Sequence, residues 1–355
     1  MRGDILTWED FLPKFLSVRR KKIAFLAVIS AILAAILAVS PALGAYSVSP
    51  REVLDIIISH ILGNPPGDRT DFVVWDVRLT SSIMAVITGF ALGVCGSVMQ
   101  AVMRNPLADP YTMGVSSGAS LGATLSLVMG VSIIPGLMGD ASVITNAFLL
   151  SLVPMGTILF LSITRKMTDT MMILCGIGVM YFFSATTSLI MLTADPTQMS
   201  AVYSWNLGNI GIGYWDNLPT MLIPTAICTA LLMIFSSRID VLTSGDSLSH
   251  TVGVDPFKVR ILSSLGVSVM IASIVSFTGT IGFIGLISPH MARAFVGSKQ
   301  AYLIPASGLV GAAMLLAANN AARILGSLPV GVITTLVGCP IFFVLLIRQR
   351  RSRWI

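Results

Sequence analysis

Long runs without a charged residue dominate the chain. Nine windows lack Asp, Glu, Lys and Arg, and each can hold the roughly 20 mostly apolar residues with which a helix crosses a bilayer. The windows are residues 23–50, 79–103, 110–139, 141–164, 170–194, 217–237, 261–292, 300–322 and 324–347. This pattern predicts an all-α polytopic membrane protein.

The seventh window is too long for a single span. It contains Gly279, Gly282 and Gly285, so we expect two helices that meet near Thr280. The total is then about ten transmembrane helices. Residues 196–215 are also uncharged, but their Pro, Gln, Asn and Gly content favours an extracytoplasmic loop with a short helix.

The composition agrees with lipid as the main solvent. Hydrophobic residues make up 55% of the 355 and charged residues only 11%, whereas an average soluble domain has about 25% charged residues. The mean hydropathy is +0.88. A water-soluble enzyme is excluded, because such a chain could not cover its own surface with polar groups.

The basic residues define an orientation. The net charge is +6, and 18 of the 22 Lys and Arg fall on one face when both termini are placed in the cytoplasm. The other face keeps only Arg51, Arg69, Arg78 and Arg323. Cytoplasmic loops carry the excess of Lys and Arg in membrane proteins, so both termini are expected to be cytoplasmic. Basic residues at the ends of membrane segments point to lipid rather than nucleic acid as their partner.

Three regions follow from these patterns. Residues 1–22 form a cytoplasmic N-terminal segment, residues 23–347 a single transmembrane domain, and residues 348–355 a basic cytoplasmic tail. Within the first region, residues 5–16 are expected to form an amphipathic piece at the membrane interface. A cleaved signal peptide is the alternative for the first apolar window, but the polar lead before that window is long for one.

The source of energy is expected to lie on another chain. Every Asp and Glu lies at or beyond the end of a window, whereas proton- or ion-coupled carriers usually need ionisable groups near the bilayer midplane. The GxxxxGK[ST] phosphate loop is also missing from the sequence. An ATPase partner would dock on the longest internal cytoplasmic loop, residues 236–260, which is polar and could hold two short helices. An ordinary solvated loop is the alternative.

No metal or cofactor is expected on this chain. His60, His250 and His290 show no pairwise ligand spacing within one helix. The four cysteines lie far apart inside apolar windows, where a thiol behaves as a small hydrophobe.

Three ordered motifs carry a resemblance to a known family. Residues 86–119 read VITGFALGVCGSVMQAVMRNPLADPYTMGVSSGA, residues 279–293 read GTIGFIGLISPHMAR, and residues 328–346 read LPVGVITTLVGCPIFFVLL. With these motifs the chain, from about Val73 to its end, resembles the permease subunits of binding-protein-dependent ABC importers of the iron-siderophore, haem and cobalamin class, the vitamin B12 permease type. Thr280 stands where that family commonly has proline.

The resemblance implies an assembly and an ATPase-coupling site. It implies a homodimer of ten-helix permease subunits, two cytoplasmic ATPases that bind ATP and Mg, and one extracytoplasmic substrate-binding protein. It also implies that short coupling helices in the 236–260 loop seat in the ATPase. The residues assigned to this coupling role are Gly245, Asp246, His250, Gly253, Val254 and Asp255.

The resemblance also assigns Arg78 and Arg323 to docking of the binding protein, whose acidic lobes meet external arginines in this family. Interfacial snorkelling of both side chains is the alternative. Ser81 stands where a second arginine is common, Asn319 where Asp is frequent, and Ser327 where Glu is frequent. The last two departures could free Arg323 for the partner or mark a divergent branch.

Five residues are expected in the translocation path or its gate. Gln100 and Asn319 are amides inside apolar windows, and Asn105 opens a Pro-fixed turn that could shape the path. Met171 and Met172 lie near the turn where the family places a cytoplasmic gate, although Met often only fills gaps in packing.

The resemblance favours import of an iron(III) complex, either a siderophore or haem, or of cobalamin, by ATP-driven alternating access. Two alternatives stay open. One is an ABC importer of an oxyanion such as molybdate, and the other is a stand-alone secondary transporter or metal exporter.

Overall fold

The computed structural model describes residues 8–165, 169–210, 215–326 and 328–349. Helices are the only regular elements in these residues. Their bounds are α1 Trp8–Val39, α2 Pro50–Ile61, α3 Arg69–Asp71, α4 Thr80–Val102, α5 Val115–Met129, α6 Gly139–Arg165, α7 Asp169–Met191, α8 Pro196–Asn206, α9 Asn217–Thr243, α10 Asp246–Thr251, α11 Pro256–Thr278, α12 Ile284–Val296, α13 Gln300–Ile324 and α14 Val330–Gln349. The all-α prediction is confirmed for this part of the chain.

Each of the ten predicted membrane segments contains one helix. Seven helical stretches of the described chain are long and apolar enough to cross a bilayer, whereas α5, α12 and the apolar part of α14 are shorter. The predicted break near Thr280 is confirmed, because α11 ends at Thr278 and α12 begins at Ile284. The short helix expected after Pro196 is α8.

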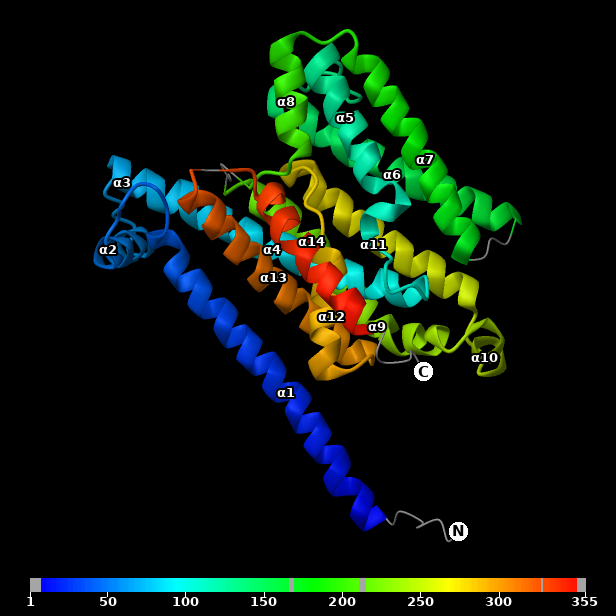
Figure 1. Cartoon of the computed structure of the whole chain (residues 1–355). Coiled ribbons are helices and arrows are strands. Elements are labelled where there is room, and N and C mark those ends of the chain that lie inside the picture. The colour runs from blue at the N-terminus through cyan, green and yellow to red at the C-terminus, as the bar shows by residue number, and fades with distance from the viewer. Residues whose placement is uncertain (1–7, 166–168, 211–214, 327, 350–355) are drawn as a thin grey trace.

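Helix α4 lies at the centre of the bundle and is buried along almost its whole length. It packs against α13, α12, α9 and α11 (Figure 1). Three of its glycines permit backbone-to-backbone contact. A Cβ at Gly89 would lie 2.4 Å from the carbonyl oxygen of Gly311, and one at Gly93 would lie 2.1 Å from that of Ser307. Small residues allow this approach inside a membrane, where helices associate through packing rather than through the hydrophobic effect.

Helices α5, α6, α7 and α8 form a second group beside α11 (Figure 1). The contact of α5 with α6 also depends on glycine, since a Cβ at Gly122 would lie 2.2 Å from the carbonyl oxygen of Asn146. By contrast, α1 runs along the outside of α13 and is largely exposed. An apolar helix with so little protein around it fits a position facing lipid.

Helix α1 is continuous from Trp8 to Val39, so the described residues of the expected interfacial piece belong to the same helix as the first apolar window. The helix ends before the window does, because Pro41 and the following irregular residues interrupt it. The next helix, α2, begins at Pro50 with a capping box between Ser49 and Glu52, which satisfies backbone N–H groups at the helix start.

Candidate functional site: a short cytoplasmic-type helix, a hydroxyl-lined cavity and an arginine pocket

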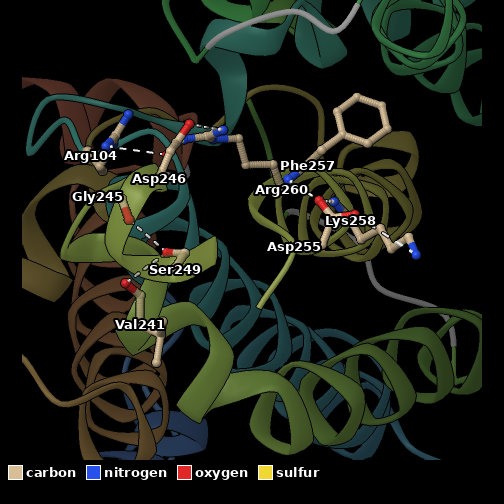
Figure 2. A network of polar contacts seen from close by, with 9 residues as sticks. All are labelled: Arg104, Val241, Gly245, Asp246, Ser249, Asp255, Phe257, Lys258 and Arg260. Atoms are coloured by element: carbon tan, nitrogen blue, oxygen red, sulfur yellow. Dashed lines mark hydrogen bonds and ion pairs between the residues drawn. The ribbon is translucent and has the colours of Figure 1, made fainter. Parts of the chain in front are cut away.

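Helix α10 is a six-residue helix at one end of the bundle, which we call the α10 end. Gly245 separates it from α9 with a φ of +109°, a conformation that side-chain-bearing residues rarely adopt. The buried hydroxyl of Ser249 donates to the carbonyl oxygens of Val241 at 3.2 Å and Gly245 at 2.8 Å. These contacts fix α10 against the end of α9 (Figure 2).

Asp246 connects α10 with two other elements. Its carboxylate accepts hydrogen bonds from both terminal nitrogens of Arg260 on α11, at 2.6 and 3.1 Å. Nη1 of Arg104, two residues past the end of α4, lies 3.4 Å from the same carboxylate (Figure 2). The hydrogen bonds from Arg260 hold the pKa of Asp246 below its usual value, so the carboxylate is ionised at neutral pH.

Two apolar side chains lie on the exposed side of α10, among polar residues. Leu248 is 51% exposed and Val252, which follows the helix, is 57% exposed. The predicted coupling residues His250 and Gly253 are exposed beside them. Sequence analysis missed Leu248 and Val252, although their i, i+4 spacing on a polar loop is a readable signal of an apolar helix face.

The prediction of two short helices in the 236–260 loop is wrong. Helix α9 continues to Thr243 and α11 already begins at Pro256, which leaves room for α10 alone. Asp255 explains the early start of α11, because its Oδ1 accepts the backbone N–H groups of Phe257 at 3.0 Å and Lys258 at 3.4 Å. Val254 is only partly exposed beside it.

A cavity of about 630 Å³ lies between α5, α7, α14 and the break before α12. Side-chain hydroxyls are frequent in its wall, and none of the lining residues is charged. The hydroxyl-bearing residues that line it are Tyr111, Ser116, Ser117, Ser120, Ser184, Thr280 and Thr335. Ser184 on α7 is also exposed, so the cavity opens to the outside of the subunit.

The five predicted path residues lie elsewhere. Gln100 is buried between α4 and α12, where it donates to the carbonyl oxygen of Leu286 at 3.2 Å and accepts from Arg293 at 3.0 Å. Met172 belongs to the hydrophobic core, whereas its neighbour Met171 is 53% exposed. Neither methionine lines the hydroxyl-lined cavity.

Asn105 begins a segment that folds back from the α10 end into the bundle. Its Oδ1 accepts the backbone N–H of Leu107 at 2.9 Å. Further along, Asp109 accepts the N–H of Tyr111 at 2.8 Å, and the Tyr111 hydroxyl accepts the N–H of Ile281 at 3.3 Å. Residues 104–111 therefore run from Asp246 to the wall of the cavity. Asp109 therefore lies inside the bundle, close to Gly285. The charge-free windows do not predict a carboxylate at this place.

Arg78 and Arg323 lie near a pocket of about 450 Å³ at the opposite end, beside α2 and α3. Arg78 is 3% exposed and donates to the carbonyl oxygens of Pro41, at 3.0 Å, and Tyr46. Arg323 donates to Ser40 Oγ at 2.6 Å, Ser82 Oγ at 3.1 Å and the amide oxygen of Asn320. These acceptors are all neutral.

Asn319 and Ser327 stand where the family often has Asp and Glu, but Arg323 is not free as a result. Its neutral acceptors hold it in place. Among the described residues, Arg323 Nε and Asn319 Nδ2 are buried without a hydrogen-bond partner, and both residues line the pocket. Ser81 donates to the Arg78 carbonyl at 3.2 Å and so faces inward. Ser327 lies outside the described residues.

The fold and these sites define a polytopic membrane permease with a short helix at one end of the bundle and an open cavity whose wall carries several hydroxyl groups. The model of the FecCD transport family matches residues 27–348. The chain therefore belongs to the FecCD transport family, and it is an ABC transporter permease and a multi-pass protein of the prokaryotic cytoplasmic membrane.

Individual proteins agree with this assignment. The hemin transport system permease protein of Yersinia pestis is 34% identical over 79% of this chain and 85% of its own length. The cobalamin import system permease protein of Halobacterium salinarum is 34% identical over 81% of this chain and 76% of its own. A solved structure of a metal-chelate type ABC transporter in an inward-facing conformation is 27% identical, with a TM-score of 0.78 over 92% of this chain and 99% of its own.

Proposed function

We propose that this chain is the permease subunit of a binding-protein-dependent ABC importer, with ten membrane-spanning helices and both termini in the cytoplasm. The α10 end is then the cytoplasmic end, because it carries most of the loops in which Lys and Arg are concentrated. Alternating access is driven by ATP hydrolysis on separate partner subunits, and the chain itself catalyses no reaction.

This proposal rests on the two sides of helix α10. One side is anchored to the bundle through Ser249 and Asp246, and the other presents Leu248 and Val252 to water. Exposed apolar residues at i, i+4 spacing are typical of a helix that lies in a groove of a partner protein. The proposed partner of α10 is the cytoplasmic ATPase, and a dimeric permease would bind two copies of it.

We predict that Leu248→Asp weakens ATPase binding by ~30-fold, which corresponds to a hot-spot contribution of about 2 kcal/mol. A charged group would have to be buried in the apolar groove of the partner. The measurement is the Kd of purified ATPase for the permease in nanodiscs. Ser247→Asp, at an exposed position about 100° around α10 from Leu248, is the control. If Leu248→Asp bound ATPase as tightly as the unaltered permease, Leu248 would not belong to the docking surface.

A second copy of this chain is the proposed partner on the side of the hydroxyl-lined cavity. Polar surface inside a membrane is costly against lipid and is normally covered by protein or by water. The cavity opens beside Ser184 on α7, and α7 is mostly exposed in the single subunit. Two copies that meet around this opening would enclose one translocation path between them.

The proposed cargo is an iron(III) complex, such as a siderophore or haem, or cobalamin. The relatives named for hemin and cobalamin support this choice. The cavity wall combines hydroxyl groups with apolar side chains and carries no charge, which supports passage of a large cargo without tight binding to it. An oxyanion such as molybdate stays the alternative cargo, and a secondary carrier stays the alternative class.

The test is uptake into proteoliposomes that contain this permease, its ATPase and its binding protein. Labelled ferric hydroxamate, haem, cobalamin and molybdate are compared, each with and without ATP. ATP-dependent uptake of one compound is expected and would identify the cargo. Uptake that does not depend on ATP would overturn the importer assignment in favour of a secondary carrier.

The pocket of Arg78 and Arg323 is the proposed docking site for an acidic group of the binding protein. Both guanidinium groups have only neutral acceptors. Arg323 and Asn319 also have donors without a partner among the described residues. A carboxylate could accept hydrogen bonds from these groups and balance their charge.

We predict that Arg323→Gln weakens binding-protein affinity by about tenfold at low salt and flattens its salt dependence. Arg69→Gln, which removes an exposed arginine at the same end, is the control. Affinity is measured by surface plasmon resonance from about 50 to about 500 mM salt, because the Debye length changes roughly threefold over this range. If both variants bind like the unaltered protein, Arg323 has only a structural role.

A further inference from the structure

We infer that Asp246 is a positioning residue that passes movement of α10 to the wall of the translocation cavity through Arg104. This inference rests on the proposed function, since it requires an ATPase that displaces α10. The Asp246 carboxylate then transmits the movement of α10 to the bundle, a role separate from the contact of α10 with the ATPase.

Asp246 connects α10 firmly to α11. Asp246 forms a two-point, charge-assisted contact with Arg260, which is 4% exposed. Such contacts are directional and about twice as strong as neutral hydrogen bonds. Arg260 Nε lacks a partner among the described residues, so the guanidinium depends on Asp246 for its charge compensation. Displacement of α10 therefore pulls on the first turns of α11.

The second step is the contact with Arg104. The same Oδ1 that accepts from Arg260 lies 3.4 Å from Arg104 Nη1, so one oxygen is shared by groups from α11 and from the end of α4 (Figure 2). Arg104 has a φ of +47°, in the left-handed region that non-glycine residues seldom occupy. This backbone turn directs the chain after α4 back into the bundle.

The third step is the short route from Arg104 to the cavity. The turn that starts at Asn105 is fixed by the Asn105–Leu107 hydrogen bond and then by Asp109, which caps the turn of Pro110–Met113. Tyr111 ends the route: it lines the cavity and accepts the N–H of Ile281, next to Thr280 in the same wall. Each part of this segment is held by its own hydrogen bonds, so it can move as a unit.

Lys258 provides a control in the same loop, since it has no assigned role in coupling. Its side chain is 76% exposed, and its ammonium group lies 3.9 Å from the Asp255 carboxylate. This contact stays within the start of α11 and does not reach the segment after α4.

The experiment compares Asp246→Asn, Asp246→Glu and Lys258→Gln in the complete reconstituted transporter. Cobalamin, ferric hydroxamate or haem is used according to which one the unaltered complex takes up. Three quantities are measured: ATPase binding to the permease, cargo taken up per ATP hydrolysed, and hydrogen exchange of residues 103–111 with and without a trapped ATP–vanadate state.

For Asp246→Asn we expect ATPase binding and hydrolysis within about threefold of the unaltered complex, whereas uptake per ATP falls by about tenfold, within the usual range of coupling between sites. The nucleotide-dependent change in exchange at residues 103–111 should disappear. Asp246→Glu should restore at least half of the uptake per ATP, and Lys258→Gln should leave this ratio unchanged. A merely structural role would not remove the exchange response while hydrolysis continues.

Arg104→Gln keeps the inference testable if Asp246→Asn destabilises the protein by leaving Arg260 unpaired. Arg104 has 31% of its side chain exposed, so its replacement disturbs folding less. Full uptake per ATP in Arg104→Gln, or an unchanged exchange response in Asp246→Asn, would overturn the inference. Failure of the unaltered permease to bind any ATPase would instead overturn the proposed function.

Discussion

Gly96→Ala is expected to prevent most of the chain from reaching its folded, monodisperse state. A Cβ at this position would lie 1.8 Å from the carbonyl oxygen and 2.6 Å from the carbonyl carbon of Gly285. Both atoms belong to backbone, so no side chain can rotate away. The helices α4 and α12 must separate instead, and α4 is the element around which the bundle is packed.

The expected cost is at the upper end of the range for overpacking, about 3 kcal/mol or more. It is large because separation of α4 and α12 also strains the Gln100 contacts with Leu286 and Arg293. The measurement is the yield of monodisperse protein after detergent extraction, together with its melting temperature. We expect the yield to fall at least tenfold.

Gly156→Ala is the matched control on α6. A Cβ there would meet no heavy atom within 4 Å, and alanine is favoured over glycine in a helix by about 1 kcal/mol. This variant should be as stable as the unaltered protein or slightly more stable. If Gly96→Ala behaved in the same way, the close approach of α4 and α12 would be contradicted.

The apolar windows predicted the main helices well, because lipid leaves a crossing backbone few choices. Each peptide group must be hydrogen-bonded within the segment, so a long charge-free window almost has to be a helix. The ends of the elements were less accessible to sequence analysis. Helix α9 enters the expected loop up to Thr243, and α1 stops at Val39, since these ends depend on Gly245, Pro41 and contacts with other helices.

The cavity could not be predicted from single residues. Gln100 attracts attention as an amide in an apolar window, but an amide can equally join two helices, and here it joins α4 to α12. The serines and threonines of the cavity give no such signal. Ser117 and Thr335 donate to backbone carbonyls of their own helices, at 2.8 Å each, as most helical hydroxyls in membranes do. They come to one wall only when the three distant motifs and α7 fold together.

Ser184→Trp is expected to reduce cargo uptake by at least tenfold while ATP hydrolysis continues. Ser184 lines the cavity at its open side, so an indole at this position projects into the proposed path. In a dimer around this opening the change occurs twice, once from each subunit. The proposed ATPase contact at α10 lies at the end of the bundle and is not altered.

Uptake and ATP hydrolysis are measured in the same proteoliposomes, and Ala185→Trp is the control. Ala185 is exposed on α7 but is turned by about 100° around the helix and does not line the cavity. An indole there should leave uptake within about twofold, because it adds only apolar area of a kind that membrane surfaces accept. Loss of uptake in Ser184→Trp alone would support the hydroxyl-lined cavity as part of the path. Equal uptake in both variants would mean that cargo crosses elsewhere, and the second copy of the chain would then have no reason to meet the first at α7.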